Sequence, residues 1–208
     1  MTHTRFPARG LYAITDGPRN DLSAVVAQAL AGGARVMQYR DKTTDAGRRR
    51  ADAAALRQLC DLHAVPLIIN DDVALAVAVG AAGVHLGRDD GDVAAARAAL
   101  GAGAIVGVSC YDSLQRARDA AAAGADYVAF GAFFPSPTKP HAARASLDLL
   151  RQSATLGLPR VAIGGITPDN APSLVEAGAD FLAVISAVFG APDVRAAAQR
   201  FARLYPAD

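Results

Sequence analysis

The sequence lacks the features that mark membrane, secreted and nucleic-acid-binding proteins. Although 52% of its 208 residues are hydrophobic, it has no uninterrupted apolar run of the roughly 18 residues that a membrane span needs. Residues 1–10 contain no apolar segment typical of a signal peptide. The 21 Lys and Arg residues nearly balance the 20 Asp and Glu residues, whereas nucleic-acid-binding proteins usually carry a basic surplus. We therefore expect neither a membrane nor a nucleic-acid partner.

Cysteine is also scarce. The two cysteines, Cys60 and Cys110, are isolated and form neither a CxxC motif nor a metal-ligand spacing. Cys60 lies in an alanine-rich helical pattern, which is typical of a small core residue. This usage predicts a reduced, cytoplasmic protein.

What the sequence does contain is a repeated alternation of short apolar runs and helical patterns. Predicted strands cover residues 11–14, 35–39, 67–69, 84–86, 105–108, 127–130, 160–163 and 181–185. Predicted helices follow at residues 22–30, 45–63, 73–79, 93–100, 113–122, 145–155, 170–176 and 192–204. Several helices end in glycine, as in Ala123-Gly124-Ala125-Asp126 and Ala177-Gly178-Ala179-Asp180.

Eight strand–helix units predict one α/β domain, residues 1–208, folded as a (β/α)8 TIM barrel. An open, doubly wound sheet is the alternative, but its usual GxGxxG motif after the first strand is absent. In a barrel the chemistry lies where the strands end, so the residues after each apolar run are the candidates for function.

Cations follow the second predicted strand. Strand alternation places Gln38, Arg40 and Lys42 on one side, where the two cations suit a polyanion such as a diphosphate. The alternative is a solvated turn in which Asp41 pairs with one of the cations.

Acidic residues follow the third and fourth predicted strands, at Asn70-Asp71-Asp72 and at Asp89-Asp90. Carboxylates on neighbouring strand ends suit Mg²⁺, which proteins hold with one or two carboxylates plus substrate phosphates. Helix capping is the alternative, but it explains one Asp for each helix and not two. His85, inside the fourth strand, is expected to be a hydrogen-bonded core residue.

Small and hydroxyl-bearing residues follow the remaining strands. Ser109 ends the fifth, and the sixth leads into Pro135-Ser136-Pro137-Thr138-Lys139, a stiff loop with two hydroxyls and a cation. Gly164 and Gly165 follow the seventh, and Ser186 the eighth, where barrels often bind a phosphate. The sequence thus predicts two anion sites at one barrel mouth.

Taken together, these motifs resemble the thiamine phosphate synthase (thiamine-phosphate pyrophosphorylase) family. The resemblance runs from the first strand to the last helix and depends on seven short motifs in order: Gln38-x-Arg40-x-Lys42, Ile69-Asn70-Asp71-Asp72, Gly83-Val84-His85-Leu86-Gly87-x-x-Asp90, Gly107-Val108-Ser109, Pro135-Ser136-x-Thr138-Lys139, Gly164-Gly165-Ile166 and Ile185-Ser186.

The resemblance implies a Mg²⁺-dependent transferase that acts on two small molecules. It would join 4-amino-2-methyl-5-hydroxymethylpyrimidine diphosphate to a thiazole phosphate, releasing pyrophosphate by dissociative substitution. Whether the thiazole carries a 2-carboxylate, and whether the protein is a homo-oligomer, stay open.

The resemblance also implies a role for individual residues. It assigns Mg²⁺ to Asp71 and Asp90. It assigns the pyrimidine diphosphate to Gln38, Arg40, Lys42, Asn70, Ser109 and Lys139, with Arg40, Lys42, Ser109 and Lys139 as the catalytic set. It assigns the thiazole phosphate to Ser136, Thr138, Gly165, Ile185 and Ser186.

Two positions depart from the family pattern. The family often has Gln at Arg88 and Thr at Ser136; Ser keeps the hydroxyl, and Arg88 either contacts a phosphate or points to solvent. A related thiazole tautomerase is an alternative function, but it has a His where this chain has Ala132. A non-catalytic phosphate-binding barrel is a further alternative, which would not need the full set of acids and cations.

Overall fold

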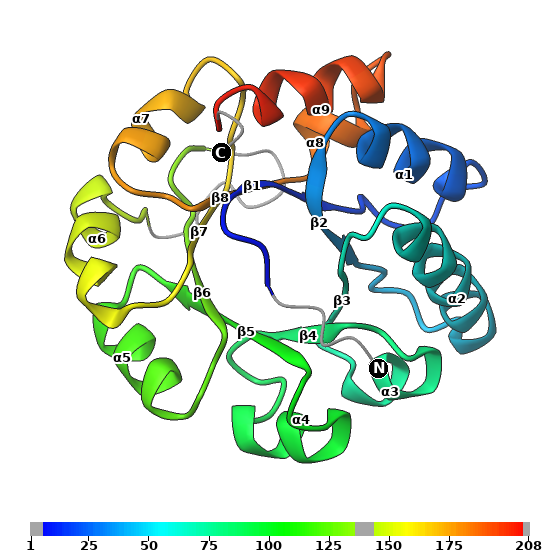
Figure 1. Ribbon diagram of the computed structural model, residues 1–208, viewed down its shortest axis with the longest axis horizontal. Coiled ribbons are helices and arrows are strands. Elements are labelled where there is room, and N and C mark those ends of the chain that lie inside the picture. Colours follow the sequence, from blue (N-terminus) through cyan, green and yellow to red (C-terminus); the bar gives the residue numbers. More distant parts are fainter. Residues whose placement is uncertain (1–5, 136–143, 206–208) are drawn as a thin grey trace.

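The computed structural model describes residues 6–135 and 144–205 and shows a closed barrel of eight parallel strands. Figure 1 looks down this barrel, with the helices forming a ring outside it. Each strand pairs with the next, and β8 pairs with β1. The strands are β1 (Gly10–Ile14), β2 (Ala34–Tyr39), β3 (Leu67–Asn70), β4 (Gly83–Leu86), β5 (Ile105–Tyr111), β6 (Tyr127–Phe130), β7 (Arg160–Ile163) and β8 (Phe181–Val184).

Helices separate the strands and cover the barrel. They are α1 (Leu22–Ala31), α2 (Ala46–Leu62), α3 (Val73–Val79), α4 (Val93–Leu100), α5 (Leu114–Ala122), α6 (Leu147–Gln152), the 3₁₀ turn η1 (Ser153–Leu156), α7 (Ala171–Glu176), α8 (Ser186–Phe189) and α9 (Val194–Ala202). The predicted (β/α)8 barrel is confirmed. The open-sheet alternative is wrong, because β1 and β8 are hydrogen-bonded neighbours.

Several predicted boundaries differ from the structure: β5, for example, runs to Tyr111 instead of residue 108, and α9 covers Val194–Ala202 instead of residues 192–204. The last strand ends at Val184, because the Ile185 carbonyl already accepts from the Phe189 N–H at 2.9 Å and begins the short helix α8. The predicted helix over 145–155 is divided into α6 and η1, and Gly157 at φ +67° ends it.

Side-chain caps explain where many of the helices begin. The carboxylates of Asp45, Asp72, Asp92 and Asp193 and the hydroxyl of Ser113 each accept from the backbone N–H three residues further on. Such a cap satisfies a donor that the helix itself leaves without a partner. These short polar residues therefore fix the first turn of α2, α3, α4, α5 and α9.

The two Ala-Gly-Ala-Asp segments fasten neighbouring strands together. Asp126, just before β6, accepts from the Val106 N–H of β5 at 2.7 Å. Asp180, just before β8, accepts from the Arg160 N–H of β7 at 2.9 Å. Each carboxylate also pairs with an arginine, Arg97 at 2.7 Å and Arg160 at 3.0 Å. The same sequence motif thus links a strand to its neighbour at two places, each near the start of the strand.

The core has two parts. One lies between the strands and the helices, and it includes Cys60, which is buried as predicted. The other fills the barrel and includes Tyr12, Tyr127 and Phe181. Phe6 joins it from the segment before β1, which runs into the centre of the ring in Figure 1. Its ring stacks on Tyr127, with centroids 4.5 Å apart.

Both cysteines are free thiols in buried positions. Within residues 6–135 and 144–205, no helix has the length and apolar character that crossing a bilayer requires.

Candidate active site

The end of β2 supplies three of the predicted residues. Gln38 points into the barrel and is only 2% exposed, Arg40 is half-buried, and Lys42 is exposed just beyond the strand. The buried hydroxyl of Thr15 accepts from the Arg40 N–H at 2.8 Å and donates to the Arg40 carbonyl at 3.2 Å. Thr15, which the sequence reasoning missed, therefore fixes the backbone that carries Arg40.

The ends of β3 and β4 bring two carboxylates together. Asp71 forms an ion pair with Lys42 and accepts from the Asn70 side-chain amide at 2.6 Å. Burial raises the pKa of Asp90 above its ordinary value, and a hydrogen bond with the Asp71 carboxyl raises that pKa further. The predicted neighbours Asp71, Asp90 and Lys42 thus form one cluster.

Capping does not account for this acidic pair. Asp72 caps α3 by accepting from the Leu75 N–H at 2.8 Å, and Asp92 caps α4 by accepting from the Ala95 N–H at 2.7 Å. Asp90 instead accepts from the Gly87 N–H at 2.8 Å. Asp71 lies in the left-handed region at φ +62°, a conformation that costs most residues free energy.

The alternative pairing proposed for Asp41 is wrong. Asp41 is buried and pairs with Arg48 of α2 at 2.9 Å, whereas Lys42 pairs with Asp71. Arg49 pairs with Asp72 at 2.8 Å in the same way. Arginines of α2 therefore neutralise the acids that would otherwise compete for the strand-end cations.

The acidic pair fits a divalent cation. Two carboxylates in hydrogen-bonding contact repel each other when both are ionised, and a bound cation relieves that repulsion. No group of three His, Cys, Asp or Glu side chains gathers around a metal-sized space in the described part of the chain. Two carboxylates suit Mg²⁺, which completes its shell with water and substrate phosphates.

Ser109 lies at the end of a hydrogen-bonded series inside the barrel. Its Oγ is 2.8 Å from Nε2 of His85, and Nδ1 of His85 is 2.9 Å from the Tyr127 hydroxyl. The Tyr127 and Tyr12 hydroxyls are 2.7 Å apart, and Gln38 donates to Tyr12 at 2.8 Å. Burial lowers the pKa of His85 to about 4. The prediction that His85 is hydrogen-bonded inside the barrel is confirmed, and its side chain is partly buried rather than fully enclosed; the roles of Tyr12 and Tyr127 were not predicted.

Two arginines contact one tyrosine ring beside the cluster, at the ends of β4 and β5. The Arg88 guanidinium lies 4.9 Å and the Arg116 guanidinium 5.7 Å from the centre of the Tyr111 ring. Arg116 also donates to the carbonyls of Ser109 at 2.7 Å and Gly87 at 3.2 Å. Arg116 thereby holds together the two strand ends that carry Ser109 and Asp90.

The residues of the second predicted anion site that the structure describes lie where β7 and β8 end. Gly164 and Gly165 adopt φ +105° and +64°, and the exposed Ser186 opens α8 after Ile185. The first N–H groups of a helix have no partner within it and can face an anion. A Cβ on Gly165 would come within 2.4 Å of the Pro135 carbonyl oxygen, so this glycine also makes room for the loop after β6.

Three predicted residues, Ser136, Thr138 and Lys139, lie outside the residues that the structure describes. Their predicted contacts with the two substrates therefore stay predictions from the sequence. Ala132, which stands where the related tautomerase has His, lies within the described part, directly after Gly131.

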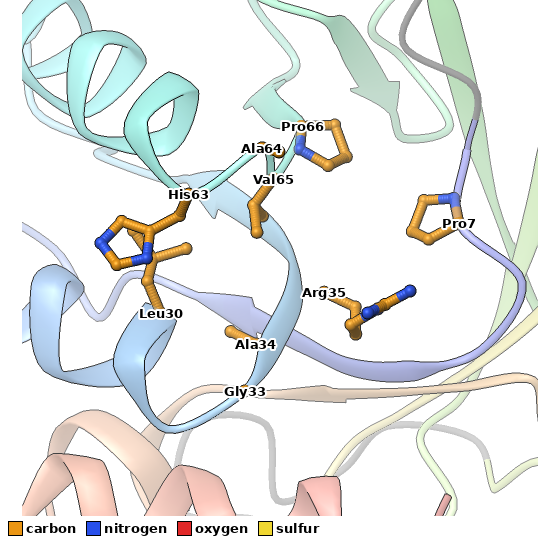
Figure 2. Close-up of a pocket in the computed structure, with 9 residues that line it drawn as sticks. All are labelled: Pro7, Leu30, Gly33, Ala34, Arg35, His63, Ala64, Val65 and Pro66. Carbon is orange, nitrogen blue, oxygen red and sulfur yellow. The ribbon is translucent and has the colours of Figure 1, made fainter. Parts of the chain in front are cut away.

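Two concavities lie at opposite ends of the barrel. One of about 200 Å³ is lined by Asp41, Lys42, Thr43, Arg49, Asn70, Asp71 and Asp72 and belongs to the candidate site. The other, of about 340 Å³, lies where β2 and β3 begin; Figure 2 shows its lining, with His63 beside Leu30 and Arg35 reaching toward Pro7. Since barrel chemistry lies at the ends of the strands, we assign the site to the smaller space.

Comparisons with known proteins agree with this geometry. A family model described as thiamine monophosphate synthase matches residues 11–188. Thiamine-phosphate synthases of Chromobacterium violaceum and Xanthomonas campestris are each 60% identical to the chain, over 93% of it and 94% of their own length. The solved thiamine phosphate pyrophosphorylase from Pyrococcus furiosus superposes with a TM-score of 0.85 at 36% identity, covering 95% of both chains.

Proposed function

Because this chain belongs to the thiamine monophosphate synthase family, we propose a specific division of two substrates among its strand ends. Its activity is that of a thiamine-phosphate synthase, a transferase acting on small molecules. The finer proposal is a Mg²⁺-dependent condensation of 4-amino-2-methyl-5-hydroxymethylpyrimidine diphosphate with 4-methyl-5-(2-phosphooxyethyl)thiazole, which yields thiamine monophosphate and pyrophosphate.

The cluster of Lys42, Asp71 and Asp90 is the observation that carries this proposal. It gathers a cation and an acidic pair from three successive strand ends, as a metal-bound diphosphate requires. Arg40 and Lys42 would bind the diphosphate oxygens, and Gln38 with Ser109 would bind the pyrimidine ring deeper in the barrel. Asn70, whose side-chain amide donates to Asp71, and Lys139, which follows β6 in the sequence, complete the proposed set.

Asp71 and Asp90 would hold the Mg²⁺. When bound, the ion supplies positive charge to the diphosphate that leaves the pyrimidine. The ion pair between Lys42 and Asp71 keeps the lysine at the same place, so both charges act on one leaving group.

The reaction needs charge stabilisation more than a protein nucleophile. The pyrimidine's amino group donates electron density to the ring, so the bond between its methylene carbon and the diphosphate oxygen can break to give a stabilised cation. Arg40, Lys42 and Lys139 then stabilise the growing negative charge on pyrophosphate. The thiazole nitrogen attacks the methylene carbon and forms the new C–N bond. Holding both reactants in one mouth avoids the entropy cost of their encounter.

We assign the thiazole phosphate to the other side of the mouth. Gly165, Ile185 and Ser186 offer backbone N–H groups there, and Ser136 and Thr138 would add hydroxyl donors. This assignment is supported by the left-handed glycines after β7 and by the short helix after β8, the combination that barrels often use for phosphate.

Pyrophosphate release tests the proposed function. We expect release from the pyrimidine diphosphate only when thiazole phosphate and Mg²⁺ are both present, and a chelator should abolish it. Release without the thiazole would contradict a two-substrate site. Conversion of a thiazole alone would favour the tautomerase, although Ala132 argues against it. A cytoplasmic location and the extent of the domain, residues 1–208, stay predictions from the sequence.

A further inference from the structure

Five polar side chains cross the interior of the barrel in one continuous series. From the β2 side to the β5 side they are Gln38, Tyr12, Tyr127, His85 and Ser109, and successive polar atoms lie 2.8, 2.7, 2.9 and 2.8 Å apart. They come from five different strands. The two ends of the series are the residues to which we assign the pyrimidine ring, and the three middle residues have no assigned role.

Packing holds the middle of the series in place. In the strand register Gly107 of β5 lies between His85 of β4 and Tyr127 of β6. A Cβ on Gly107 would come within 1.9 Å of the Tyr127 ring, so the missing side chain lets the two rings meet across β5. Their centroids are 5.6 Å apart, and Phe6 stacks on Tyr127 at 4.5 Å.

The donors and acceptors of the series are consistent with a single direction. Gln38 donates through Nε2 to Tyr12. In that direction, Tyr12 accepts from Gln38 and donates its proton to Tyr127, and Tyr127 donates to Nδ1 of His85. A neutral imidazole that accepts at Nδ1 carries its proton on Nε2, from which it donates to Ser109. The Ser109 O–H is then left to donate outward, and Oε1 of Gln38 is left to accept.

We propose that this series is a one-way hydrogen-bonded chain in which Tyr12, Tyr127 and His85 are positioning residues. They present an acceptor at Gln38 and a donor at Ser109 to the same bound ring. The assignment of that ring rests on the proposed function: an aminopyrimidine carries an amino donor and ring-nitrogen acceptors, so it matches this pair. A ring with the opposite polarity would leave buried polar groups unpaired, which is costly.

The direction can be tested without substrate. Nitrogen-15 NMR of the full-length protein with labelled histidine distinguishes the two neutral tautomers, and the His85 signals are those lost in His85→Gln. We expect a neutral His85 protonated on Nε2 at neutral pH. Protonation on Nδ1, or a charged imidazolium, would overturn the one-way chain whatever the enzyme's activity.

The positioning role can be tested by removing one hydroxyl. Tyr127→Phe keeps the ring and breaks the chain at its middle. We expect its KM for the pyrimidine diphosphate to rise roughly 5- to 20-fold, the scale of a lost oriented hydrogen bond, with the KM for thiazole phosphate unchanged. Tyr205→Phe is the matched control, because that buried hydroxyl donates to the Ala179 carbonyl at 3.1 Å, outside the chain.

An equal rise of both KM values in Tyr127→Phe, or the same change in Tyr205→Phe, would overturn the positioning role. Failure of the proposed function would look different, because the wild-type enzyme itself would then release no pyrophosphate from the two substrates.

Discussion

The position of His85 inside the barrel gives the protein's stability a pH dependence. Burial lowers its pKa to about 4, whereas the unfolded chain binds the proton near pH ~6.5. Between these values only the unfolded state is protonated, so stability falls as the pH falls from about 6.5 to about 4. His85→Gln should remove up to about 3 kcal/mol of that loss.

Denaturant unfolding across this pH range measures the effect. Groups other than His85 titrate equally in both proteins, so the difference between them isolates the imidazole. His63→Gln, which removes an exposed histidine at the end of α2, is the control. An identical pH dependence in wild-type and His85→Gln proteins would show that His85 is not held neutral.

Asp90 offers a test of the metal assignment. Asp90→Asn keeps an acceptor for the Gly87 N–H but removes one of the two carboxylates. We expect activity to fall and the Mg²⁺ concentration for half-maximal activity to rise, because one charged ligand is lost. Asp89→Asn, at the exposed neighbour, should leave Mg²⁺ titrations of activity unchanged. An unaltered Mg²⁺ requirement in Asp90→Asn would contradict the assignment.

Lys139 lies outside the described residues, and its role is predicted from the sequence. A cation on the leaving pyrophosphate stabilises the transition state more than the ground state, so its loss should appear mainly in kcat. We expect Lys139→Ala to lower kcat by about 10²–10³, with much weaker effects on pyrimidine diphosphate binding, and Lys139→Arg to rescue only partly. Steady-state kinetics that show only a raised KM would make Lys139 a binding residue.

At the level of the elements, the turn after β7 depends on a glycine with little free space. Gly165 and Gly80 have nearly the same φ, +64° and +63°, but a Cβ on Gly165 would collide with the carbonyls of Phe134 and Pro135, and one on Gly80 meets nothing within 4 Å. Gly80→Ala should therefore cost only the backbone strain, about 1–2 kcal/mol.

Gly165→Ala should cost a further 1–3 kcal/mol, approximately, because the loop after β6 must move. Chemical denaturation of the two variants measures the difference. Equal losses would mean that the β6 loop yields freely to a side chain. The same geometry makes Ser186 a cleaner position than Gly165 for testing the thiazole phosphate site.

Most of the elements could be predicted because the apolar runs and the capping residues are local signals. Asp72 and Asp92 mark the starts of α3 and α4 in sequence as they do in space. The helix α8 was missed because its four residues continue the apolar run of β8. Its start depends on the backbone turn at Ile185, and the side-chain pattern does not predict that turn.

The residues at the strand ends could be predicted from the sequence, but the residues that hold them in position could not. Asp71, Asp90 and Lys42 follow apolar runs, so the barrel topology alone brings them together. Thr15 and Tyr127 were missed because their partners, Arg40 and His85, are distant in sequence and become neighbours only through the strand register. Gly107 lets the Tyr127 and His85 rings meet, but nothing in the sequence around it indicates this role.

The whole molecule depends on a filled barrel interior. Phe6, which precedes β1, fills part of this interior. Its ring stacks on Tyr127 and packs against Phe181, with the Phe6 and Phe181 ring centroids 4.9 Å apart. Phe6→Ala would leave a space there, and since Phe6 is only partly buried, we expect a loss of about 2–3 kcal/mol, slightly below that of fully buried phenylalanines. Thermal and denaturant unfolding should show this loss of stability. Leu62→Ala, at a side chain that is 84% exposed, should lose almost no stability. If Phe6→Ala lost as little stability as Leu62→Ala, the barrel interior would not depend on Phe6 for its packing.

The pairing of β1 with β8 has a consequence for how the protein is made. The register partners Gly10 and Phe181 lie near opposite ends of the sequence, and a ribosome delivers the first long before the last. Until β8 emerges, β1 lacks one of its two neighbouring strands, and an unpaired strand edge invites association with other chains. Closure therefore comes late in synthesis, and a message truncated before β8 would yield a chain unable to shield β1.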